Sequence, residues 1–138
     1  MNQLNFIGVK VALINKGKVL TILRDNLPNI PYPNMWDLAG GGRENEESPY
    51  ETMRREVKEE LAIDISESNI VWTKYHESIT NAGEKSVFMV ANICDSQIEN
   101  IKFGEEGQKY EMLAFEDFID NEDVIEQLKK RFLEYLNK

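Results

Sequence analysis

The sequence has almost none of the side chains that build disulfides and zinc sites. Among 138 residues there is one cysteine, Cys94, and one histidine, His76. A single cysteine excludes a disulfide within the chain, and so few nitrogen and sulfur ligands argue against a zinc site of the usual kind. Metal chemistry in this protein therefore has to use oxygen ligands.

Long hydrophobic runs are absent as well. No stretch is apolar enough to span a membrane, and the N-terminal segment, MNQLNFIGVK, lacks the apolar run of a secretory signal. Together with the single cysteine, this predicts a cytoplasmic protein with no membrane partner. A hydrophobic content of 41%, without internal repeats or low-complexity tracts, predicts one globular domain over residues 1–138.

Basic residues are outnumbered, with 16 lysines and arginines against 25 aspartates and glutamates and a net charge of −9. Such a surface repels nucleic-acid polymers and anionic membranes, and it also repels a bare polyphosphate. A protein of this charge that acts on a phosphoanhydride needs a cation that neutralises both its own carboxylates and the ligand.

Proline is missing after residue 49, and Pro49 itself marks the start of the most informative helix. Ser48 is placed to cap this helix, Pro49 suits its first position, and Glu51 follows at the spacing of a capping box. We therefore predict a helix over residues 49–61. Its apolar residues form one stripe that can pack on a sheet, namely Tyr50, Met53, Val57 and Leu61.

Three glutamates, Glu56, Glu59 and Glu60, lie on an arc beside that stripe. Glu56 and Glu60 are like charges one turn apart, and such a pair costs a helix roughly 0.2–0.5 kcal/mol when nothing binds between them. A divalent cation such as Mg²⁺, which prefers oxygen ligands, reverses that sign. The alternative is an acidic helix face in solvent.

The spacing around these acids resembles the Nudix box, Gx5Ex7REUxEExGU, in which U is a bulky aliphatic residue. Eight of its nine specified positions match: Gly41, Glu47, Arg55, Glu56, Val57, Glu59, Glu60 and Ile63. The departure is Ala62, where the family has glycine, and we expect this alanine to end the helix in a left-handed conformation. A second departure is Ala39, where relatives often carry proline.

The resemblance implies an α+β fold with a mixed β-sheet sandwiched between helices. It also implies hydrolysis of a nucleoside diphosphate linked to another group, with Mg²⁺ as cofactor and Mn²⁺ as its substitute. By the resemblance, the metal ligands are Glu56, Glu59, Glu60 and the carbonyl of Gly40. Glu47 and Arg55, with Gly41, are implied to brace the box.

A second motif, FGEEGQ at residues 103–108, resembles the loop of mutator-type Nudix enzymes that supplies a further glutamate. Glu106 occupies that position. We expect Glu106 to accept the proton of the attacking water, with Glu59 as the second candidate and Glu105 as the neighbouring fallback. The alternative is two glutamates in a flexible loop.

Candidate substrate contacts precede the glycines. Arg24 closes a predicted strand and is either a phosphate or base contact or a solvated strand end. Residues 25–34 hold three of the four prolines and cannot form a regular element, so this stiff loop is a candidate wall of a pocket. Tyr32, or Trp36 after the loop, is available to stack on a base, the alternative being ordinary packing.

The remaining pattern predicts a hairpin over residues 6–14 and 19–24, short strands over 35–38, 70–76, 86–93 and 110–114, and a turn over 81–85. From Asp123 onward, apolar residues recur at helical spacing. This last helix packs on the sheet or forms a dimer surface, so monomer and homodimer both stay open. His76, at a strand end, is expected to be solvated or held by one hydrogen bond.

The resemblance of residues 103–108 favours a nucleoside triphosphate, including oxidised ones, as the small-molecule partner, with nucleotide monophosphate and pyrophosphate as products. A nucleoside diphosphate sugar is an alternative substrate. A further alternative is a Nudix module that senses a nucleotide without hydrolysing it. That alternative predicts the loss of box acids, and none is lost, so we expect a hydrolase.

Overall fold

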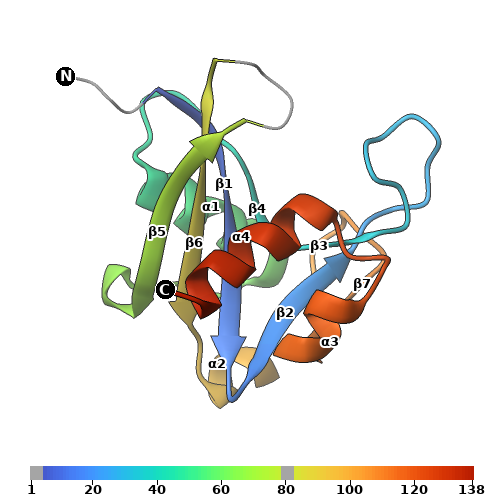
Figure 1. Ribbon diagram of the computed structural model, residues 1–138. Coiled ribbons are helices and arrows are strands. Elements are labelled where there is room, and N and C mark those ends of the chain that lie inside the picture. The colour runs from blue at the N-terminus through green and yellow to red at the C-terminus, as the bar shows by residue number, and fades with distance from the viewer. Residues whose placement is uncertain (1–4, 79–82) are drawn as a thin grey trace.

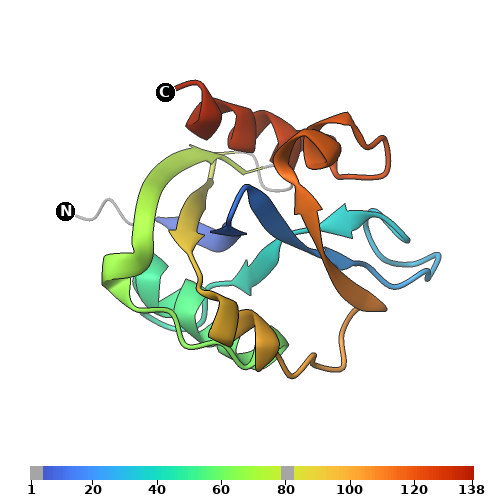
Figure 2. The same ribbon diagram turned by 90° about the horizontal axis from the view of Figure 1, so that it is seen from below.

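The structure, a computed structural model, describes residues 5–78 and 83–138. One mixed sheet forms the middle layer of a sandwich, with α1 and α2 on one side and α3 and α4 on the other (Figures 1 and 2). The strands are β1 Phe6–Asn15, β2 Lys18–Leu23, β3 Trp36–Asp37, β4 Ala39–Gly42, β5 Ile70–Glu77, β6 Lys85–Asn92 and β7 Lys109–Ala114. The helices are α1 Pro49–Leu61, α2 Asp95–Glu99, α3 Phe115–Asp120 and α4 Glu126–Leu136, with a 3₁₀ turn at Glu67–Asn69. This arrangement confirms the predicted α+β sandwich.

Strand β1 organises the sheet. It pairs in parallel with β6 on one side, and antiparallel with both β4 and β2 on the other. β4 takes the first half of β1, at Gly8–Val11, whereas β2 pairs only with its last residues, Ile14 and Asn15. β7 then extends the sheet beyond β2. Residues of β4, of β2 and of the segment before β7 therefore come to line a common cavity.

Alternating side chains of the central strands supply two cores. Val9, Val11 and Leu13 of β1 point to the side of α1, where Met53, Val57 and Leu61 cover them. Ala12 points to the other side, to Leu128 and Phe132 of α4 and to Phe118 of α3. Successive side chains of a strand point to opposite faces of the sheet, so the continuous apolar run of β1 has to be covered by helices on both faces.

Helix α1 has the predicted bounds and caps. The Ser48 hydroxyl accepts the N–H of Glu51 at 3.1 Å, and the Glu51 carboxylate accepts the N–H of Ser48 at 2.8 Å. At the other end, Ala62 is left-handed, with φ 60° and ψ 31°, and its N–H donates to Lys58. The predicted left-handed cap is thus confirmed.

Replacing Ala62 with glycine is expected to stabilise the protein. A residue other than glycine in this conformation costs the folded state about 1 kcal/mol or more, and glycine removes that cost. Part of the stability gained is lost again, because glycine also makes the unfolded chain more flexible. We expect a rise of a few degrees in melting temperature, measured calorimetrically. The same change at Ala114, where φ is −57°, should lower it. A destabilised Ala62→Gly protein would contradict the cap geometry.

Other predicted elements differ in detail. The strand predicted over 35–38 is shorter, because only β3 lies within that range and β4 begins just after it, at Ala39. The last helix begins at Glu126 and packs on the sheet. Residues 81 and 82 of the predicted turn lie outside the described residues, while Lys85 already belongs to β6. α2 and α3 were not predicted, because both are short and their N-cap residues, Cys94 and Ala114, are not serine, threonine, aspartate or asparagine.

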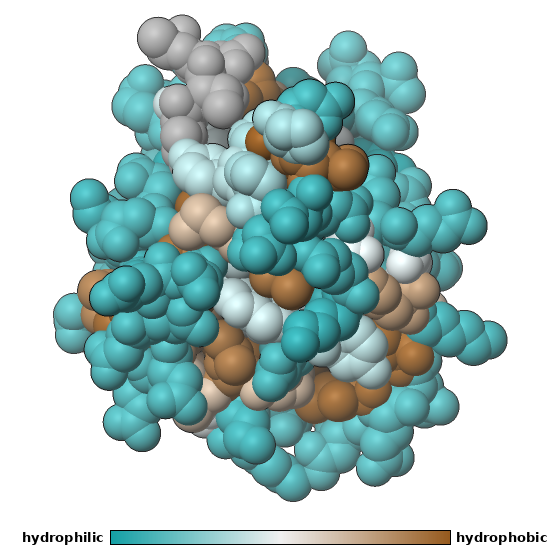
Figure 3. All heavy atoms as spheres, turned by 90° about the vertical axis from the view of Figure 1, so that its right-hand side faces the viewer, coloured by the Kyte–Doolittle hydropathy of each residue, from teal (hydrophilic) through white to brown (hydrophobic). Residues whose placement is uncertain are grey.

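The outer surface matches the composition. The described residues on the face shown in Figure 3 are mostly hydrophilic, and hydrophobic residues occur there in small separate groups. Within residues 5–78 and 83–138, no helix has the length and apolar character needed to cross a membrane.

Candidate active site

Two neighbouring cavities meet at Gly41 and Gly42 of β4. The first, of about 420 Å³, contains Glu56 and Glu60 of α1 and Glu106 of the loop before β7, and we call it the carboxylate cavity. The second, of about 300 Å³, lies toward α4 and has mostly apolar walls, and we call it the apolar cavity. Both are lined by the same five residues, namely Lys10, Arg24, Asp37, Gly41 and Gly42.

Glu60 is held at the carboxylate cavity by the backbone of β4. Its Oε1 accepts the N–H of Gly40 at 3.0 Å. Burial raises the pKa of Glu60 to about 7, although this hydrogen bond and Lys10 oppose the rise. Gly40 has φ 133°, and a Cβ there would clash with the carbonyl of Val9, so only glycine brings this backbone so close to β1.

Glu56 lies against Gly41, where a Cβ would overlap the Glu56 carboxyl group. Burial raises the pKa of Glu56, the guanidinium of Arg55 opposes that rise, and the charges of Glu59 and Glu106 add to it. Carboxylates from α1 and from the loop before β7 are therefore close enough to repel the charge on Glu56, and the ionised form of Glu56 is disfavoured without a cation.

The donor chemistry of this cavity fits a hard divalent cation. Glu56, Glu60, Glu106 and the carbonyl of Gly40 offer only oxygen atoms, which Mg²⁺ and Mn²⁺ prefer. In the described part of the chain, no three acidic, histidine or cysteine side chains already converge as a metal cage. The helix carboxylates are instead held by protein donors, Arg55 and the N–H of Gly40.

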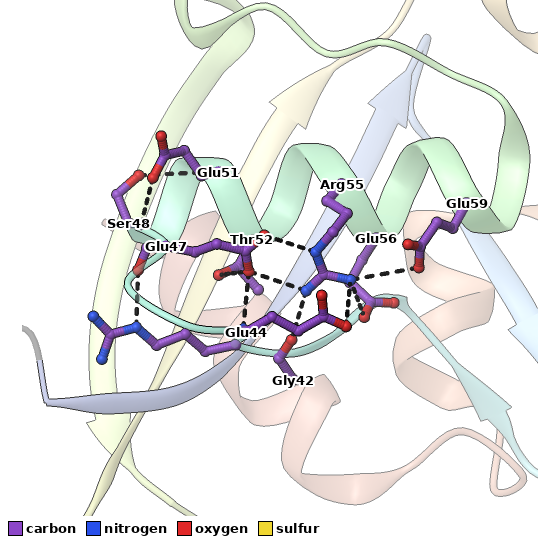
Figure 4. A network of polar contacts seen from close by, with 10 residues as sticks. Gly42, Glu44, Glu47, Ser48, Glu51, Thr52, Arg55, Glu56 and Glu59 are labelled. Atoms are coloured by element: carbon purple, nitrogen blue, oxygen red, sulfur yellow. Dashed lines mark hydrogen bonds and ion pairs between the residues drawn. The ribbon is translucent and has the colours of Figure 1, made fainter.

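Arg55 is the centre of a polar network that ties α1 to the preceding loop (Figure 4). Its Nε and Nη2 donate to the two carboxylate oxygens of Glu47 at 2.7 and 3.0 Å, and Nη2 also donates to the carbonyl of Gly42 at 2.8 Å. Its Nη1 donates to Glu56 at 3.0 Å. The guanidinium lowers the pKa of Glu47 to about 2. This geometry is that of a brace.

The other acids near the cavity differ in position. Glu59 has a side chain that is 60% exposed, bonds to Nη1 of Arg55 at 3.4 Å and does not line the carboxylate cavity. Glu44 lies 3.5 Å from the same nitrogen, and Glu105 is exposed outside the cavity. The structure therefore brings together Glu56, Glu60 and Glu106, and leaves Glu59 at the rim.

The loop that carries Glu106 is fixed at both ends. The N–H of Gly104 donates to the carbonyl of Glu60 at 2.8 Å, and a Cβ on Gly104 would come within 2.9 Å of the carbonyl of Glu59. On the other side, the Gln108 side chain donates to the carbonyl of Arg24 at 2.7 Å and to Asn34 at 2.9 Å. These bonds hold the loop across the end of α1, with Glu106 at the cavity.

Lys10 and Asp37 are two site residues that the sequence analysis missed. Asp37 is only 5% exposed and its Oδ2 accepts Nζ of Lys10 at 2.9 Å and Nη1 of Arg24 at 3.0 Å. One buried carboxylate thus holds two cations at the junction of both cavities. A signal was present, because Lys10 is the one charged residue within the apolar run FIGVKVALI.

The predicted substrate contacts lie at the apolar cavity. Tyr32 and Pro31 line it from the proline-rich loop, and Arg24 lines both cavities. Trp36 instead packs on the core beneath α4, so for Trp36 ordinary packing is what the structure shows. His76 lines neither cavity and shares a 2.7 Å hydrogen bond with Glu134.

Comparison with known proteins identifies the family. Residues 4–136 match the NUDIX domain, which is almost the whole chain. The chain belongs to the Nudix family. This Nudix chain is 32% identical over 95 residues to the nucleoside triphosphatase NudI of Escherichia coli, and the match covers 64% of this chain and 67% of NudI.

Solved structures share the Nudix fold. The MutT protein of Methanosarcina mazei superimposes with a TM-score of 0.70 at 22% identity, over 100% of both chains. A bifunctional NMN adenylyltransferase/ADP ribose pyrophosphatase of Francisella tularensis, complexed with AMP and a manganese ion, gives a TM-score of 0.76 at 17% identity, over 96% of this chain and 41% of that one. The Nudix chain is accordingly an enzyme, a pyrophosphohydrolase.

Proposed function

We propose that this Nudix enzyme hydrolyses a nucleoside triphosphate, including oxidised forms, to nucleotide monophosphate and pyrophosphate. The observation that carries the proposal is that Glu56, Glu60 and Glu106 all line one cavity, which adjoins an apolar one. Two cations, Lys10 and Arg24, lie at the junction, where a phosphate chain running from a nucleoside toward the carboxylates would pass. The name of NudI, a nucleoside triphosphatase, supports the same substrate class.

The carboxylates have to be neutralised before a polyphosphate can enter. We propose that Glu56, Glu60 and the carbonyl of Gly40 hold Mg²⁺, with Glu59 able to join from the rim, and that Mn²⁺ can substitute, as the complex of the Francisella protein suggests. When bound, such a cation neutralises phosphate oxygens and lowers the pKa of water.

The chain's own residues then have three tasks. Lys10 and Arg24, positioned by Asp37, bind the phosphates, and Arg55 with Glu47 and Gly41 keeps α1 in place. Glu106 accepts a proton from the attacking water. The oxygen of that water bonds to phosphorus while the anhydride P–O bond breaks, releasing pyrophosphate. Glu59 is the second candidate for this proton.

We further propose that the nucleoside occupies the apolar cavity, with Tyr32 against the base. At about 300 Å³, this cavity falls at the lower end of the range of small-molecule sites. We also propose that residues 1–138 act as one domain, because a single sheet carries both cavities.

Phosphate and pyrophosphate release should be measured with nucleoside triphosphates, nucleoside diphosphate sugars and dinucleotides. We expect turnover of triphosphates with Mg²⁺ and none after chelation with EDTA. Millimolar Mg²⁺ alone should raise the melting temperature, because it binds only the folded state. Turnover of diphosphate sugars alone would correct the substrate class. If no substrate turned over while a nucleotide still raised the melting temperature, the sensor alternative would replace the hydrolase.

A further inference from the structure

Arg131 is a cation in the interior of the protein. It lies on the buried side of α4 and is only 4% exposed. Its Nη1 donates to the hydroxyl of Ser86 at 3.1 Å and its Nη2 to the carbonyl of Glu77 at 3.1 Å. Both acceptors are neutral, and no carboxylate in residues 5–78 or 83–138 forms an ion pair with Arg131.

Within residues 5–78 and 83–138, most of the hydrogen-bonding capacity of this guanidinium is unused. An arginine has five N–H donors and no acceptor, and these two bonds use two of them. Nε is buried and has no acceptor among the residues that the structure describes. Burying a charge and an N–H without partners costs stability, so a function for this arginine is the simplest reason to keep it.

Arg131 also lines the apolar cavity, beside Leu128 of the same helix and Ile125, the residue that precedes the helix. Lys10 and Arg24 line the apolar cavity as well, and they also line the carboxylate cavity, which Arg131 does not. If the proposed function holds and phosphates lie at the junction of the two cavities, the nucleoside extends along the apolar walls toward α4. Its base then meets Arg131.

We propose that Arg131 determines base specificity by selecting a base that carries an exocyclic carbonyl group, in place of an amino group, at one ring position. This position is C6 in purines and C4 in pyrimidines. Guanine offers O6 and N7 to an arginine, and uracil and thymine offer O4. Adenine and cytosine carry an amino group there, and that donor would face a second donor.

Two substrate pairs differ only at this position and in the proton on the adjacent ring nitrogen. Inosine and adenosine triphosphates differ at C6, and uridine and cytidine triphosphates differ at C4. One well-made contact of this type discriminates by roughly tenfold to a hundredfold. We expect kcat/KM for the carbonyl member of each pair to exceed that of the amino member by about this factor. Equal values within both pairs would overturn the inference.

Arg131→Met tests whether Arg131 is the residue that selects the base. Methionine fills similar space without a charge, and we expect the carbonyl preference to disappear while adenosine triphosphate is still hydrolysed. Lys130→Met, an exposed change one residue earlier on α4, is the matched control and should keep the preference. A preference that persists in Arg131→Met would overturn the role of Arg131.

Binding of monophosphates separates this inference from the proposed hydrolysis. Dissociation constants of inosine and adenosine monophosphate should differ in the same direction in wild type, and converge in Arg131→Met. This comparison needs no turnover. Carbonyl-selective binding without hydrolysis would support Arg131 as the residue that selects the base and would reject the hydrolase. Hydrolysis without selectivity would support the hydrolase and reject this role of Arg131. The wild-type comparison does not depend on how well the variant folds.

Discussion

Glutamine in place of Glu60 is expected to lower kcat for nucleotide hydrolysis by roughly 10²–10³-fold and to leave the fold intact. The amide oxygen can still accept the N–H of Gly40, so the contact between α1 and β4 is preserved. What disappears is the negative charge that we propose as a metal ligand. Steady-state kinetics with saturating Mg²⁺ would measure the loss.

The stability of the metal-free protein, unlike its activity, should not fall when Glu60 becomes glutamine. The pKa of Glu60 is about 7 in the folded protein, above its ordinary value of 4.5, so ionisation of Glu60 opposes folding as the pH rises from 4.5 through 7. Glutamine removes that penalty. Without metal at pH 8, the Glu60→Gln protein should therefore melt at the same temperature as wild type or higher, and millimolar Mg²⁺ should no longer raise it as much.

Glu99→Gln is the matched control, since this exposed glutamate of α2 lies outside both cavities. It should match wild type in activity and in its response to Mg²⁺. Near-full activity of Glu60→Gln would remove Glu60 from the proposed ligand set. A lower melting temperature without metal would show instead that Glu60 is a structural residue.

The second large effect is expected at Arg55. Changing it to methionine removes the partner of Glu47 and Glu56 and leaves the carbonyl of Gly42 without its donor. Breaking a buried ion pair costs about 3–5 kcal/mol, and the partial exposure of this network should bring the cost to roughly 3 kcal/mol or less. We also expect kcat to fall, because the box loop is no longer tied to α1. Urea unfolding would measure the stability change.

Acid provides an internal check on this explanation. The folded-state pKa of Glu47 is lowered from 4.5 to about 2, so its contribution is complete above pH 4.5 and is lost as the pH falls toward 2. The stability difference between wild type and Arg55→Met should shrink over that range. A difference that does not depend on pH would point to lost packing, not lost charge pairing.

The neighbouring arginine is a suitable control. Arg54 pairs with Asp64 at 2.7 Å, but both side chains are about half exposed, at 48% and 56%. Exposed pairs of this kind contribute at most about 1 kcal/mol. Arg54→Met should therefore be close to wild type in both stability and activity. Equal losses at Arg54 and Arg55 would reject the brace.

The sequence alone determined the features that depend on neighbours along the chain. The bounds of α1 follow from Ser48, Pro49 and Glu51, and its cap at Ala62 follows from the spacing of the box. Two runs of β-branched and apolar residues, separated by a short turn, predicted the hairpin of β1 and β2 for the same reason. These patterns need only residues within a few positions of one another, so one sequence suffices.

Only the tertiary structure decided which of these side chains share a cavity. Glu59 and Glu60 are adjacent on α1, yet one bonds to Arg55 at the rim while the N–H of Gly40 holds the other inside. Lys10, Asp37 and Arg131 gained their roles from contacts 27 to 54 residues apart in the chain. Helical spacing fixes the direction of a side chain, but the burial and the partners that set its charge and contacts come from packing of distant strands.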